Sequence, residues 1–156
     1  MIRNISVIIC AVIGILKFLL LRLRHDKILL IDFDFTIVSN HYDQINKNYI
    51  EMPLEVDKDI LKIMTKNKEI CKVIFTARGL RSKNYIYRNL AWRKYFNDVT
   101  YFGSTKVKCF VAKYIVAPLF KKIIWIDDLG DLNFETGEIT KHPTPSTSTK
   151  IEFIRW

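Results

Sequence analysis

The stretch ILLIDFDFTI, residues 28–37, places two aspartates at the end of a run of four aliphatic residues. Such a run, followed at once by charge, is typical of a buried strand that ends at the edge of a sheet. Asp32 and Asp34 stand two residues apart at this end. Because burying an unpaired carboxylate costs several kcal/mol, the pair is expected to have a cation as its partner.

Strands and helices alternate along the rest of the chain. Apolar runs predict strands over residues 27–33, 71–76, 98–102 and 122–127. Helical spacing predicts helices over residues 54–67 (opened by Pro53), 82–94, and 105–117 (stopped by Pro118). This alternation predicts an α/β fold, a Rossmann-like three-layer sandwich with a mainly parallel central sheet. Near the C-terminus the pattern predicts a hairpin around Thr136-Gly137 and an edge strand over residues 151–156.

Composition limits the class of protein. The chain has 156 residues, of which 49% are apolar and 26% charged, and this balance indicates a globular protein with one main domain. Its three cysteines form no CxxC pair, which disfavours a disulfide framework or a zinc site and favours a reducing compartment. The net charge of +9 favours an anionic partner: a phosphorylated substrate, a nucleic acid or an acidic lipid. Solvated helix faces would account for the same lysines and arginines.

Residues 1–25 form a hydrophobic N-terminal helix in this interpretation, and residues 26–156 form the folded domain. Ile5 to Leu21 is apolar except for Ser6, Gly14 and Lys17. Seventeen helical residues span roughly 26 Å, slightly less than a bilayer core, so a membrane anchor is expected, with Lys17 reaching toward the interface. Arg22, Arg24 and Lys27 follow the apolar run, and this basic flank favours a cytoplasmic or matrix location for the domain.

Three other interpretations of the same segment stay open. A cleaved secretory signal is disfavoured, because no small-x-small cleavage site follows the apolar run. An organelle-targeting segment fits the absence of acidic residues before Asp26, although such segments are usually more amphipathic. A helix buried against another subunit would show the same pattern at this length.

Polar side chains gather where the predicted parallel strands end. The strand ends and the turns after them carry Asp32 and Asp34, Thr76 with Ala77 and Arg78, and Asp127 with Asp128. Ser104-Thr105-Lys106 opens a helix and offers a cation. Since the carboxyl ends of parallel strands meet at one edge, four carboxylates are expected together there, and oxygen ligands of this kind suit Mg²⁺. With Thr76 and Lys106, the ion would form a cradle for a phosphoryl group.

Four segments in this order resemble the motifs of the haloacid dehalogenase superfamily. DFDFT (32–36) resembles its first motif, DxDx[TV], and VIFTAR (73–78) its second, a strand ending in Thr or Ser. Lys106 matches the basic third motif and IIWIDD (123–128) the acidic fourth. The resemblance covers about residues 27–131. It implies a magnesium-dependent phosphatase that works through an aspartyl-phosphate intermediate.

The resemblance also implies a role for each residue. Asp32 would be the nucleophile. Asp34 would be the general acid and then the general base, and its backbone carbonyl would also bind the metal. Thr76 would bind the phosphoryl oxygens and Lys106 would neutralise their charge, with Lys108 as the alternative lysine. Asp128 would be the direct metal ligand.

Three more residues near these motifs belong to the expected site, and a fourth does not. Asp127 would bind the metal beside Asp128 or through water. Ala77 and Arg78 follow Thr76 and would line the substrate site, although surface arginines are common and Thr76 could equally cap a helix. Asp131, one position earlier than the last acid of the usual fourth motif, is expected to be a loop or cap residue rather than a ligand.

The spacing between motifs leaves no room for a sizeable cap domain, because 41 residues separate Asp34 from Thr76 and 29 separate Thr76 from Lys106. Members of the family without caps have open sites that take large or surface-presented substrates, or use a neighbouring subunit as a lid. A lipid or membrane-bound sugar phosphate would fit an anchor so close to the first strand, and a nucleic-acid phosphate would fit the basic and aromatic residues from Arg81 to Tyr95. The alternative is an accessory subunit of a membrane complex that keeps the fold without turnover.

Overall fold

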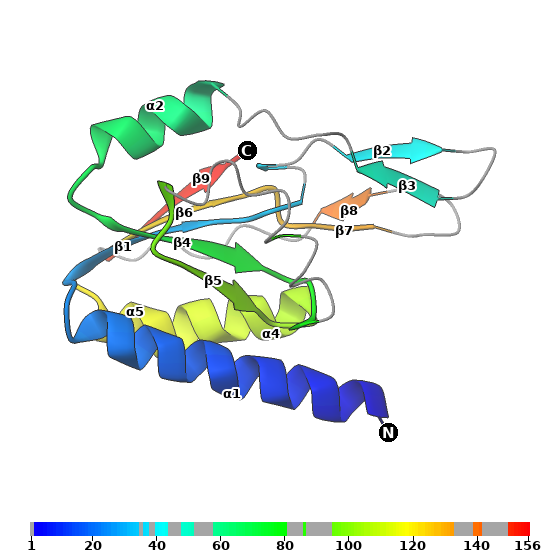
Figure 1. Cartoon of the computed structure of the whole chain (residues 1–156), viewed down its shortest axis with the longest axis horizontal. Helices are drawn as coiled ribbons and strands as arrows, with labels where there is room; N and C mark the ends of the chain where they lie inside the picture. Colours follow the sequence, from blue (N-terminus) through cyan, green and yellow to red (C-terminus); the bar gives the residue numbers. More distant parts are fainter. Residues whose placement is uncertain are drawn as a thin grey trace.

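The centre of the protein is a five-stranded sheet in which every strand is parallel to its neighbours (Figure 1). The computed structural model describes residues 2–34, 36–37, 40–43, 48–51, 58–80, 86, 95–132, 139–141 and 150–156. In spatial order the strands are β5 (Asp98–Tyr101), β4 (Cys71–Thr76), β1 (Lys27–Ile31), β6 (Lys122–Asp127) and β9 (Ile151–Arg155). The mainly parallel α/β fold predicted from the sequence is confirmed at this level.

Helices cover both faces of the sheet (Figure 1). One face carries α1 (Ile2–Arg22), α4 (Thr105–Val111), the π-helical segment η3 (Ala112–Val116) and α5 (Ala117–Leu119). The opposite face carries α2 (Lys58–Lys66). The predicted helix 54–67 therefore corresponds to α2, and residues 52–57 lie outside the described residues. The predicted helix 82–94 also lies outside them, apart from Ile86, which is helical.

Strand β1 divides the core into two layers. Its side chains alternate, as they must in a pleated strand: Ile28 and Leu30 face the layer of α1 and α4, whereas Leu29 and Ile31 face that of α2. All four are fully buried. A central strand buried on both faces needs such a continuous aliphatic run, which is why the quoted stretch determines the position of everything around it.

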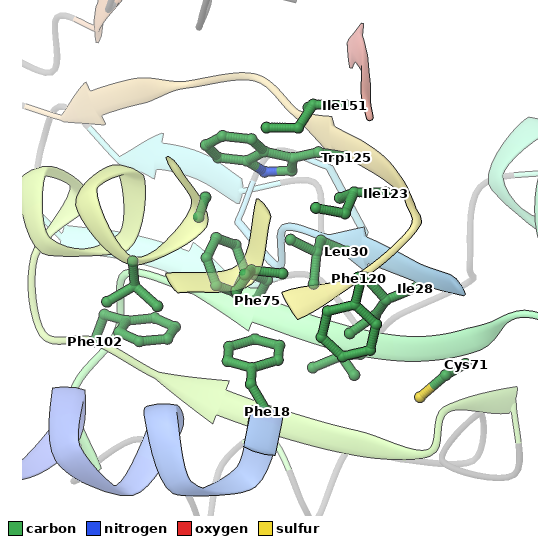
Figure 2. Close-up of a cluster of buried hydrophobic side chains, with 14 of the residues drawn as sticks. Phe18, Ile28, Leu30, Cys71, Phe75, Phe102, Phe120, Ile123, Trp125 and Ile151 are labelled. Carbon is green, nitrogen blue, oxygen red and sulfur yellow. The ribbon is translucent and has the colours of Figure 1, made fainter. Parts of the chain in front are cut away.

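The larger core layer is built around aromatic rings (Figure 2). Phe75 of β4 contacts Phe18 of α1, Phe102 and Trp125 of β6, with ring centroids 5.8, 4.9 and 5.7 Å apart in edge-to-face arrangements. Such pairs add to the free energy gained from burial alone. Phe18 joins α1 to this layer, so the N-terminal helix shares the core of the sheet.

Two short hairpins accompany the central sheet. β2 (Asn40–Asp43) pairs with β3 (Asn48–Glu51), and β7 (Gly130–Leu132) pairs with β8 (Ile139–Lys141), both antiparallel. The second agrees with the hairpin predicted after Asp131, whose connecting residues lie outside the described ones. The first was not predicted, and it occupies part of the interval where no sizeable cap was expected.

The helix after β5 extends further than predicted. It continues through Pro118 and ends at Leu119 instead of stopping at Ala117. Proline has no N–H to donate and its ring crowds the carbonyl four residues earlier. The preceding turn is wide, with the Ala117 N–H donating to the Ala112 carbonyl, and a π-helical turn of this kind accommodates the proline.

Other strand bounds differ slightly from the predictions. The strand expected over 27–33 ends at Ile31, the one expected over 98–102 ends at Tyr101, and the edge strand ends at Arg155. Strands β4 and β6 have the predicted bounds. The early end of β1 places Asp32 and Asp34 beyond the strand rather than within it.

Candidate active site

Two aspartates from neighbouring strands meet at the carboxyl edge of the sheet. Asp32 follows β1, Asp127 ends β6, and the two strands are in parallel register with Ile31 beside Ile126. The Asp32 N–H donates to the Ile126 carbonyl at 2.9 Å, which continues the ladder by one residue. Asp128 adds a third carboxylate, and one ligand oxygen from each of the three lies within 4.8 Å of the others. Of the four carboxylates expected together from the sequence, the structure groups these three and leaves Asp34 out.

Lys108 lies between the two deepest carboxylates. Its Nζ is 2.9 Å from Oδ1 of Asp32 and 2.7 Å from Oδ2 of Asp127. The side chains of all three residues are almost completely buried. Two carboxylates from different strands therefore share one ammonium group, with water largely excluded.

The structure places Lys106, the lysine expected from the sequence, on the exposed side of α4. Lys108, the alternative, is the residue in the site. Helix α4 begins at Thr105, and the positions it turns toward the sheet are Thr105, Lys108 and Val111. Helical geometry explains the difference, because residues three and four apart share a face whereas residue 106 lies on the opposite side.

Burial controls the protonation of this cluster. Loss of solvent raises the pKa of Asp32 well above its ordinary value, the neighbouring charge of Asp127 raises it further, and Lys108 only partly offsets both. Burial alone would lower the pKa of Lys108, but the charges and hydrogen bonds of Asp32 and Asp127 outweigh it and raise that pKa. The lysine is therefore charged, and the site carries more negative than positive charge when its carboxylates are ionised.

Asp127 is held by donors on both oxygens. Oδ2 accepts the indole N–H of Trp125 at 2.8 Å, and Oδ1 accepts the backbone N–H of Leu129 at 2.8 Å. Leu129 has a φ of +48°, a region that non-glycine residues seldom occupy, and its side chain is buried. Strain of this kind persists where the surrounding structure fixes it, often beside functional groups. Trp125 and Leu129 were not singled out from the sequence.

Thr76 ends β4, the strand on the other side of β1. It is fully buried, and its Oγ1 accepts the backbone N–H of Arg78 at 3.1 Å. Ala77 lies between them and is half-buried. The three predicted residues of the second motif thus lie at the same edge as Asp32, and the Thr76 hydroxyl organises the turn that follows the strand.

Asp34 faces a different partner from Asp32. The guanidinium of Arg78 donates two hydrogen bonds to its carboxylate, from Nε to Oδ2 at 2.9 Å and from Nη2 to Oδ1 at 2.7 Å. Both side chains are about a quarter exposed, at 25% and 23%. The Arg78 guanidinium also lies 5.4 Å from the ring centre of Phe33. This forked pair joins the turn after β1 to the turn after β4, in a position that solvent reaches.

Two further residues of the motif segments, Thr36 of DFDFT and Asp131 after the fourth motif, lie outside this group of carboxylates. Thr36 is buried, and its hydroxyl has no hydrogen-bond partner among the described residues. Asp131 lies on β7, and the structure describes its backbone only.

The donor set fits a hard divalent cation. Three carboxylates and one ammonium group leave a formal excess of two negative charges in a mostly buried site, and oxygen ligands with this excess suit Mg²⁺. Asp128 is the most accessible of the three carboxylates, at 9% exposure. Asp34 is not part of this group of three; its carboxylate is engaged with Arg78.

No protein-family model, curated protein or solved structure matches this chain. The chemistry of the site therefore rests on the residues themselves: a buried carboxylate beside a cation, a second carboxylate in reach of solvent, and further acids able to hold a metal ion.

Proposed function

We propose that the protein is a magnesium-dependent phosphomonoester hydrolase of the haloacid dehalogenase type, with a Rossmann-like fold and an aspartyl-phosphate intermediate. The observation that carries the proposal is the buried Asp32–Lys108–Asp127 cluster, joined by Asp128, at the carboxyl edge of adjacent strands. A purely structural role gives little reason to crowd three acids in a buried place, because burying ion pairs seldom stabilises a fold.

In the first step Asp32 attacks the phosphorus atom of the substrate. A bond forms between a carboxylate oxygen of Asp32 and phosphorus, and the bond from phosphorus to the ester oxygen breaks. Asp34 gives its proton to the departing alcohol. Lys108 already lies 2.9 Å from Asp32, so its charge is placed beside the oxygens that become more negative.

In the second step Asp34, now ionised, takes a proton from water. The resulting hydroxide attacks phosphorus, the bond to Asp32 breaks, and inorganic phosphate leaves with Asp32 restored as a carboxylate. The two aspartates can divide these roles because Asp32 is buried with Lys108 whereas Asp34 is partly open to solvent.

Asp32, Asp128 and the backbone carbonyl of Asp34 would hold the magnesium ion, with Asp127 beside them. When bound, Mg²⁺ would neutralise phosphoryl charge and orient the transferred group. Asp127 has its oxygens engaged by Trp125, Leu129 and Lys108, so its main contribution is to hold that lysine.

Arg78, Ala77 and Thr76 would form the substrate side of the site. Arg78 is paired with Asp34 through a forked contact. A phosphate dianion offers the same forked geometry as a carboxylate. Exchange of Arg78 from Asp34 to the phosphoryl oxygens would therefore bind substrate and release the Asp34 side chain to face the ester oxygen.

The decisive experiment measures hydrolysis of an aryl phosphate by the full chain, since α1 shares the core and should not be removed. We expect turnover with Mg²⁺, none with chelator, and a loss of at least about a thousandfold in Asp32→Asn. The exposed Lys106→Met is the matched control and should keep full activity. Incubation of the wild type with substrate should label Asp32 with a phosphoryl group that hydroxylamine removes.

The second candidate is an accessory subunit that binds an ion without turnover. It is favoured by one observation: Lys108 and the donors around Asp127 satisfy the deepest carboxylates without further ligands. Calorimetric Mg²⁺ binding that Asp128→Asn weakens, together with no hydrolysis of lipid, sugar or nucleic-acid phosphates and no labelled Asp32, would establish this role instead.

A further inference from the structure

Helix α1 is fixed to the domain along one face. Cys10, Gly14 and Phe18, each four residues from the next, point toward the sheet, and both Cys10 and Phe18 are buried. A Cβ at Gly14 would lie 2.8 Å from the ring of Phe102, so the helix backbone approaches that ring closely. Lys17 donates to Asp98 at 2.6 Å and to the Val99 carbonyl at 2.7 Å. The predicted membrane-directed Lys17 instead joins α1 to β5.

The opposite face of α1 is apolar and exposed from Ile5 to Leu20. It consists of Ile5, Ile8, Ile9, Val12, Leu16, Leu19 and Leu20, and Leu23 continues it just after the helix, with exposures from 45% to 82%. Soluble proteins rarely expose so continuous an aliphatic surface unless it contacts something. By length and composition the helix could also cross a bilayer, with a mean hydropathy of 2.5 for the span Asn4–Arg22. Only 17% of that span is buried in the protein, so most of it is open to contact with lipid.

Aromatic and basic residues extend this surface onto the neighbouring helix. α4 and η3 cover the same face of the sheet as α1 (Figure 1). Their outward stripe holds Lys106, Phe110, Lys113 and Tyr114, all exposed. Phe110 and Tyr114 pack on each other with ring centroids 4.8 Å apart, and the Lys113 ammonium lies 5.1 Å from the Tyr114 ring. Aromatic rings and lysines at the rim of an aliphatic surface are typical of the lipid headgroup region.

Charge identifies the occupant. No acidic residue occurs before Asp26, whereas Arg24 and Lys27 are exposed at the end of α1 and the chain carries +9 overall. A second copy of the chain would bring like charges together, but an anionic bilayer would attract them. We propose that α1 lies flat in the headgroup layer of an anionic membrane, with its aliphatic face in lipid and its other face still packed on the sheet.

This docking differs from a spanning anchor, because a helix that crossed the bilayer would have to give up Phe18, Lys17 and Gly14 as contacts. It also has a consequence for position. Val7, near the start of α1, packs against Gly103 just after β5, whereas Lys17 reaches Asp98 at the beginning of β5. The first half of α1 therefore lies beside the carboxyl edge of the sheet, and docking would bring that edge to the membrane surface. The docking itself does not depend on the proposed hydrolase activity.

The test adds full-length protein to preformed vesicles of phosphatidylcholine alone or mixed equally with phosphatidylserine, and measures flotation. We expect strong flotation with the mixed vesicles, weaker flotation with phosphatidylcholine, and a decrease with added salt. The pair Leu16→Glu and Leu20→Glu should weaken binding by more than about tenfold, because two leucines leave the lipid and two charges oppose it. An N-terminal tag should stay open to protease added outside the vesicles.

The matched control is the pair Thr65→Glu and Lys66→Gln on α2, at the other face of the sheet. Both positions are exposed, and the pair lowers the net charge by the same two units. It should bind vesicles like the wild type. The proposal is overturned if the wild type does not float, if the Leu16/Leu20 pair floats equally well, or if the tag becomes protected, which would show a spanning helix. If the wild type is a dimer that does not bind vesicles, and the Leu16/Leu20 variant is a monomer, this face would be assigned to self-association instead.

Discussion

Two lysines on the same helical layer, Lys108 of α4 and Lys17 of α1, each reach an aspartate of the sheet in opposite surroundings. Lys108 is 2% exposed and serves two aspartates at the carboxyl edge. Lys17 is 28% exposed and serves Asp98, which begins β5, and the next carbonyl. The ion-pair distances are similar, between 2.6 and 2.9 Å, so geometry alone does not separate them. Burial separates the two lysines, because a charge removed from water is stabilised only by its protein partners.

The largest effect is expected from Lys108→Met. This change leaves two buried carboxylates without their cation, and breaking a buried ion pair on one side costs about 3–5 kcal/mol. Urea unfolding in the presence of chelator would measure it. Lys106→Met, two residues away and exposed, should change the free energy of unfolding by less than about 0.5 kcal/mol. Equal effects of the two variants would mean that Lys108 is not the buried partner.

The next effect concerns how α1 is packed rather than how it is charged. Gly14→Val should destabilise the protein by about 1–3 kcal/mol, because the new Cβ would meet the fully buried ring of Phe102. Gly79→Val is the control, since nothing lies within 4 Å of its Cβ position. Thermal unfolding of both variants would show whether contacts dominate the attachment of α1. A neutral Gly14→Val would indicate that α1 packs elsewhere.

Asp32→Asn is expected to stabilise the protein near neutral pH when metal is chelated. Burial and Asp127 raise the folded-state pKa of Asp32 above its unfolded value. The native state therefore binds more protons in that interval, and the free energy of unfolding falls as pH rises from the unfolded pKa through the folded one. Asparagine does not titrate, so the variant avoids this loss of stability, and Asp127 stays paired with Lys108. Urea titrations across the acidic range should show a flatter profile for Asp32→Asn; an unchanged slope would assign the pKa shift to another group.

The fold class could be predicted mainly from β1, because four aliphatic residues followed at once by charge are typical of a central strand with a polar end. Strands β4 and β6 followed from the same logic and have the predicted bounds. The β2–β3 hairpin was missed because its residues, NHYD and NYIE, have no apolar run to mark them as strands.

The choice of lysine shows what the local pattern omitted. Ser104-Thr105-Lys106 marked a helix start, but the start does not say which residue turns inward. Counting back from the buried Val111 and Val116 in steps of three and four leads to position 108. A lysine at that position interrupts the apolar stripe, and the interruption itself was the available signal. The Asp34–Arg78 pair depends on two turns from distant parts of the chain and has no local signature.

The smallest effect tests the second lysine of the comparison. A double-mutant cycle of Lys17→Met and Asp98→Asn should give a coupling energy of about 0.5–1 kcal/mol, because water still reaches both groups. The Lys62–Asp59 pair on α2 is the control: its side chains are 77% and 69% exposed, and its coupling should be about 0.3 kcal/mol or less. Added salt should reduce both. A Lys17–Asp98 coupling as large as the effect of Lys108→Met would mean that α1 excludes water as completely as the carboxyl edge of the sheet does. A coupling smaller than that of Lys62–Asp59 would mean that α1 is held on the sheet by the packing of Phe18 and Gly14 rather than by this ion pair.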